Sequence, residues 1–95
     1  MHTYKSCLEN GRYSFLTEGT VVPDTDLEEK LKECPEYLKS DFDPQDGRYR
    51  LTGHGYSILI SNYPGEDYLS FRVIAPSEEK ADKITNKFRK LIGLK

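Results

Sequence analysis

The chain has 95 residues, which is enough for one domain spanning residues 1–95 and too few for two hydrophobic cores. Charged residues make up 32% of the sequence and the net charge is −2, which argues against nucleic acid as the main partner. No apolar run approaches the roughly 18 residues of a membrane helix. We therefore expect a cytoplasmic protein that does not bind a membrane.

The first element in the sequence is a predicted β-hairpin. The stretch TYKSCLENGRYSFLTE contains two alternating runs that predict strands at about 3–9 and 12–18. Between them, Asn10-Gly11 is the pair that favours a type I′ turn, in which both central residues have positive φ. Two tight strands at the start of the chain are expected.

A helix is predicted next, with Asp24 or Thr25 as its N-cap. Its apolar residues recur at helical spacing and should face the core: Leu27, Leu31, Cys34 and Leu38. Pro35 should kink this helix, because proline removes a backbone hydrogen bond. The following stretch KSDFDPQDG has turn-forming residues and no regular period, which predicts a loop.

Three strand-like runs and a second helix complete the predicted order ββαβββα. The runs RYRLT, YSILISN and YLSFRVIA each carry one apolar face. Pro76-Ser77 should begin the last helix and Gly93 should end it. The apolar stripe between them consists of Ala81, Ile84, Phe88, Leu91 and Ile92. The pattern predicts an α+β two-layer sandwich, with two helices packed on a mainly antiparallel sheet.

About half of the chain, residues 46–94, resembles the C-terminal domain of the phosphohexomutases, the phosphomannomutase and phosphoglucomutase group. The pieces that carry the similarity are DGRYRL, GYSILISNYPGEDYLSFRVIA and SEEKADKITNKFRKLIG. The resemblance implies a helix-on-sheet fold and a substrate-phosphate loop at SNYPGED. That loop keeps only Glu66 of the family motif Arg-Pro-Ser-Gly-Thr-Glu-Pro, so the phosphate-holding residues are not retained.

The strongest candidate site is a cluster of carboxylates. Asp41, Asp43 and Asp46 lie within six positions and are followed by Gly47, which is close to the spacing of a calcium-binding loop. Thr52 stands where an EF-hand requires its closing acid, so any such site should be weak. A second acidic loop, with Glu66 and Asp67, could complete the metal ligands. An acidic turn without function is the alternative interpretation.

Charge is distributed unevenly along the chain, and this leaves two other partners open. Nine acids lie between residues 24 and 46, which suggests a protein-interaction surface on the predicted first helix. The last helix carries a basic stripe that could contact nucleic acid weakly: Lys80, Lys83, Lys87 and Lys90. Mutual neutralisation of the two regions is the simpler explanation.

The remaining reactive residues do not form a recognisable catalytic group. His54 lies between two glycines and His2 lies near the start of the chain, and neither has a second ligand at metal-binding spacing. Cys7 and Cys34 are expected to be buried free thiols, although a single bridge between them stays open. We therefore predict a small non-enzymatic binding module, with Ca²⁺ as the candidate cofactor and a protein partner as the alternative.

Overall fold

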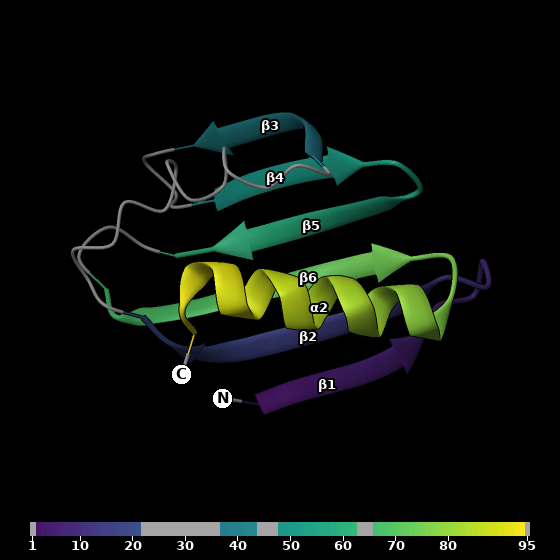
Figure 1. Ribbon diagram of the computed structural model, residues 1–95, viewed down its shortest axis with the longest axis horizontal. Helices are drawn as coiled ribbons and strands as arrows, with labels where there is room; N and C mark the ends of the chain where they lie inside the picture. The colour runs from purple at the N-terminus through teal and green to yellow at the C-terminus, as the bar shows by residue number, and fades with distance from the viewer. Residues whose placement is uncertain (1, 22–36, 44–47, 63–65, 95) are drawn as a thin grey trace.

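The computed structural model describes residues 2–21, 37–43, 48–62 and 66–94. Six strands form one antiparallel sheet in the order β1-β2-β6-β5-β4-β3, and α2 crosses one face of it (Figure 1). The elements are β1 (His2–Cys7), β2 (Tyr13–Thr20), β3 (Tyr37–Asp43), β4 (Arg48–Gly53), β5 (Tyr56–Ser61), β6 (Tyr68–Ala75) and α2 (Glu78–Ile92).

The core lies between the sheet and α2, and it follows the alternation of the central strands. On β4, β5 and β6 every second side chain is buried, as predicted for the last two: Leu51, Ile58, Ile60, Leu69, Phe71 and Val73. The intervening residues are half-buried or exposed. Burying each large apolar side chain contributes about 1.5–3 kcal/mol, so this single face supplies much of the stability.

Helix α2 begins and ends at the residues that the sequence predicts. The Ser77 hydroxyl accepts a hydrogen bond from the Lys80 backbone N–H at 3.2 Å, and Gly93 has a left-handed φ of 68°. The Leu94 N–H then donates to the Arg89 carbonyl, which satisfies an end of the helix that would otherwise lack partners. In the core, the Phe88 ring meets Phe71 edge-on with centroids 4.8 Å apart.

The predicted order ββαβββα, with two helices on the sheet, is wrong. The described residues contain one helix, and residues 37–43 form a strand where the sequence predicts the end of a helix and a loop. Leu38, expected on a helical stripe, lies in β3, and the rest of the predicted first helix falls outside the described residues. Pairing with β4 makes this segment a strand, and local sequence patterns do not contain that pairing.

The first hairpin is confirmed, but its turn differs from the prediction. Cys7 pairs with Tyr13, and the loop is closed by a 2.6 Å hydrogen bond from the Leu8 N–H to the Arg12 carbonyl. Gly11 has a φ of 82°, whereas no residue other than glycine has a positive φ in the described part of the chain. The loop therefore holds three residues with glycine last, rather than the two of a type I′ turn. Cys7 is exposed, not buried.

Of the described residues, only α2 forms a helix, and it is too short and too polar to cross a membrane.

Candidate functional site

The structure separates the carboxylates that the sequence groups into one calcium loop. Asp41 and Asp43 occupy strand positions in β3, directly opposite Arg50 and Arg48 of β4. Opposite charges at facing positions stabilise an antiparallel pair, so these acids have a structural partner across the sheet. Asp46 lies outside the described residues.

The second acidic loop reaches the same end of the sheet but lies three strands away. Asp43 shares a cross-strand row with Arg48, Ser61 and Ser70, so three strand spacings, or about 14 Å, separate β3 from β6. The Asp67 carbonyl accepts a hydrogen bond from the Val21 N–H at 2.7 Å, just before β6 begins. No group of three metal-ligating side chains is found within the described parts of the chain.

A different group of residues forms a pocket between α2 and the turn that joins β4 to β5. We call it the lysine pocket; its volume is about 530 Å³ and its lining residues are His54, Tyr56, Ser77, Glu79, Lys80, Lys83, Ile84 and Lys87. A volume between roughly 300 and 1,000 Å³ is typical of small-molecule sites. Three lysines and one carboxylate give this pocket a net positive charge.

The β4–β5 turn holds Lys80 at the edge of the pocket. The Lys80 ammonium donates to the His54 carbonyl at 2.8 Å and lies 5.7 Å from the centre of the Tyr56 ring. The Tyr56 ring in turn packs over Gly53, where any larger side chain would collide with it. Gly55 has a φ of 76°, a conformation that favours glycine. The two glycines around His54 therefore shape this wall of the pocket.

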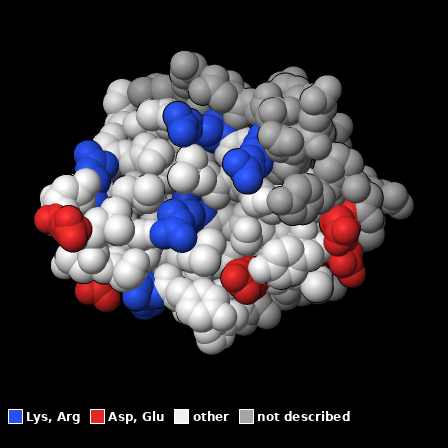
Figure 2. All heavy atoms as spheres, turned by 180° about the vertical axis from the view of Figure 1, so that it is seen from behind, with Lys and Arg blue, Asp and Glu red and all other residues white. Residues whose placement is uncertain are grey.

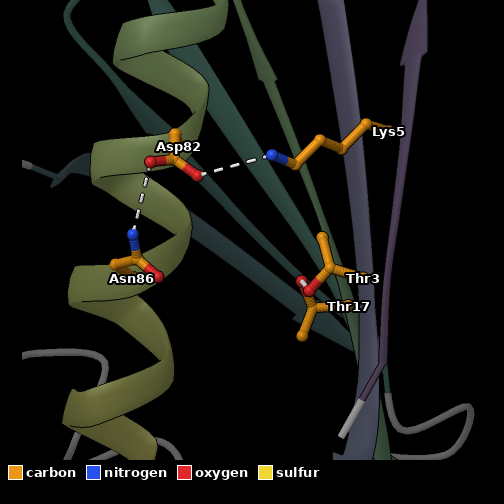
Figure 3. Close-up of polar contacts among 5 residues, drawn as sticks. All are labelled: Thr3, Lys5, Thr17, Asp82 and Asn86. Carbon is orange, nitrogen blue, oxygen red and sulfur yellow. Dashed lines mark hydrogen bonds and ion pairs between the residues drawn. The ribbon is translucent and has the colours of Figure 1, made fainter.

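The opposite side of α2 shows the usual pattern of a compensated surface. The Lys5 ammonium of β1 lies 3.9 Å from the Asp82 carboxylate, and the Asn86 amide donates to the same acid at 3.5 Å (Figure 3). Both charged side chains are 55% exposed, so this ion pair contributes little to stability. The positive charge is thus matched on this side of the helix, whereas on the other side it accumulates.

The face of the sheet opposite α2 forms a second surface, which we call the outer face. Its side chains come from three cross-strand rows, and those described on β1, β2, β6, β5 and β4 are His2, Glu18, Ser70, Ser61, Arg48; Tyr4, Leu16, Arg72, Leu59, Arg50; and Ser6, Ser14, Ile74, Ser57, Thr52. Figure 2 views this side of the molecule: basic groups extend across its middle, and several acidic groups lie nearer its margins.

Two contacts organise the outer face. The Arg72 guanidinium donates to the hydroxyl of the buried Ser14 at 2.6 Å, which fixes the centre of the face. Near β1, partial burial and a hydrogen bond to Glu18 raise the pKa of the Tyr68 hydroxyl above its usual 10.0. The sequence analysis identified the polar character of this face through its serines, as well as the lysine stripe of α2. It did not identify the pocket, because only the folded chain brings the His54 turn to that stripe.

No family model, curated protein or solved structure matches this chain. The similarity to the phosphohexomutase C-terminal domain therefore stays a prediction from the sequence.

Proposed function

We propose that this protein is a binding module whose lysine pocket takes a small organic anion carrying a phosphate or carboxylate group. The observation that carries this proposal is the convergence of Lys80, Lys83 and Lys87 on one concave site that holds a single carboxylate, Glu79. Like charges gathered in this way repel one another, and an anion relieves that repulsion.

The form of the site favours a small ligand over an extended polymer. Tyr56 and Ile84 give the pocket an apolar part beside its charged groups, which suits an anion that also has a planar or aliphatic body. Lys80 is already oriented by its hydrogen bond to the His54 carbonyl, so less side-chain freedom is lost when it binds. A chain with a net charge of −2 gains little general attraction for nucleic acid.

The polar groups of the pocket support binding rather than catalysis. The Ser77 hydroxyl serves as the N-cap of α2, and His54 contacts Lys80 through its backbone carbonyl. A nucleophilic mechanism requires a base positioned beside the attacking group. Ser77 is instead used to hold the helix that carries the lysines.

The test is a titration with inorganic phosphate, pyrophosphate and adenosine monophosphate, followed by amide NMR shifts. Shifts should concentrate at residues 53–56 and 77–87, and affinity should rise from phosphate, at about millimolar Kd, to the larger anions. Lys83→Gln should weaken binding several-fold. Lys90→Gln is the matched control, because it removes the same charge from the same exposed helix without lining the pocket.

Two results would contradict the proposal. Equal weakening by Lys83→Gln and Lys90→Gln would show that anions respond only to the general charge of the helix. Tight, strongly salt-dependent binding of a single-stranded oligonucleotide, with adenosine monophosphate inactive, would instead assign the basic stripe to a polymeric partner.

A further inference from the structure

The outer face has the composition of a protein-binding surface. Tyr4 is 52% exposed and Tyr68 46%, and they are the large hydrophobic residues that stand out from the described surface. Three arginines and three half-buried aliphatic side chains lie beside them: Arg48, Arg50, Arg72, Leu16, Leu59 and Ile74. Tyrosine and arginine are enriched where proteins meet, because they combine large contact area with hydrogen bonding.

We propose that the outer face binds a second copy of this chain, so that two sheets pack face to face about a two-fold axis. Each row of the face carries charges of both signs or a charge beside apolar groups. In the first row, Glu18 lies on the second strand of the sheet and Arg48 on the fifth. The two positions are equally far from the centre of the sheet, which lies between β6 and β5.

An axis parallel to the strands makes this arrangement self-complementary. Rotation about such an axis places β2 of one copy over β4 of the other while keeping each row in register. Glu18 then faces the partner's Arg48, and the same contact recurs through symmetry. In the middle row, Arg72 lies over the partner's Leu59, and in the first row serines face serines, so the sheets can approach to the usual 10 Å.

The alternative axis, across the strands, is disfavoured by charge. It places every residue of the middle row over its own copy, so that Arg72 meets Arg72 and Arg50 meets Arg50. Like charges directly opposed in an interface are strongly unfavourable. Charge complementarity therefore selects one of the two symmetric arrangements.

The size of the face allows a specific but weak dimer. Six strands span about 24 Å between their outer axes, and the three rows with their side chains cover about 20 Å along the strands. The two copies then bury about 1,000 Å² in total, which is at the lower limit for a specific interface. We expect a dissociation constant in the micromolar range.

Charge reversal at the two partner positions tests this arrangement by sedimentation velocity over a range of concentrations. Glu18→Arg places arginine against Arg48 in both contacts, and Arg48→Glu places glutamate against Glu18. Each variant alone should dimerise at least about tenfold more weakly than the parent. An equimolar mixture of the two should form a heterodimer, because the charges are again opposite in both contacts.

The mixture also separates loss of pairing from loss of folding, since a variant that has unfolded cannot be rescued by mixing. Circular dichroism of each variant gives an independent check of the fold. A parent chain that stays monomeric at several hundred micromolar would overturn the proposal. So would single variants that dimerise like the parent, or folded variants that fail to associate when mixed.

Discussion

The two faces of the sheet are built from the same alternating strands, yet they differ in how much of their chemistry is used within the chain. On the helix face, Phe71 and Val73 of β6 are fully buried against α2 and its neighbours. On the outer face, the alternate residue Arg72 reaches only across the surface to Ser14, and Tyr4 and Tyr68 remain about half exposed. The comparison shows that the helix face carries the stability, whereas the outer face is available for contacts with other molecules.

The largest effect is expected from a change that breaks the helix face. Phe88→Ala removes a ring that is 2% exposed and packs edge-on against Phe71, so it leaves a cavity that the sheet cannot fill. The free energy of unfolding should fall by about 3–5 kcal/mol, a large share of the 5–15 kcal/mol typical of a domain. Urea denaturation measures the change.

Leu91→Ala is the control for this prediction, because Leu91 lies on the same helix but is only partly buried. It should cost clearly less than Phe88→Ala. Equal costs, or a Phe88→Ala variant as stable as the parent, would mean that α2 does not form the core in the way described here.

The difference between the faces also explains which parts of the fold the sequence could predict. Strands β5 and β6 and helix α2 are signalled locally, because their apolar periods and the caps Ser77 and Gly93 lie within the elements themselves. Strand β3 is not, because the alternation in Tyr37–Asp43 is short, acidic and followed by proline. Its structure depends on pairing with β4, which is information from a distant part of the chain.

The candidate sites follow the same rule. The lysine stripe of α2 is visible in the sequence as a spacing of three and four residues, but the turn that completes the pocket is 26 positions from Lys80. The charge complementarity of Glu18 and Arg48 depends on the order of the strands, which no local pattern encodes. For Asn10, the residue pair predicts the existence of the turn, while the register of the strands sets its length.

A smaller effect, at alkaline pH, is expected on the outer face. The pKa of Tyr68 is raised above 10.0 by partial burial and by its hydrogen bond to Glu18, so the folded state keeps the proton longer than the unfolded state. This contribution to stability is complete below the unfolded pKa and is lost as the pH rises through the folded pKa. Stability should therefore fall above about pH 10.

Tyr68→Phe should reduce that alkaline loss, measured as the change in urea midpoint between about pH 9 and pH 11. Tyr4→Phe is the control, because it removes a second hydroxyl of similar exposure from the same face. If the two variants lose stability in parallel with the parent, the Tyr68–Glu18 hydrogen bond does not stabilise the outer face.

The smallest effect is expected from calcium, at the edge of the sheet where the acidic segments lie. The calcium site of Asp41, Asp43, Asp46, Glu66 and Asp67 stays a prediction, and the position of Asp43 opposite Arg48 weakens it, because a guanidinium already faces this strand position. At a calcium concentration equal to the dissociation constant, binding stabilises by only about 0.4 kcal/mol. The melting temperature of a domain of this size should then rise by no more than about 3 °C. Arg48→Gln should enlarge the calcium effect, since the carboxylates lose their internal counter-charge, whereas Asp43→Asn should abolish it. If magnesium at equal ionic strength acts like calcium in the parent and in both variants, the acids serve only to pair β3 with β4.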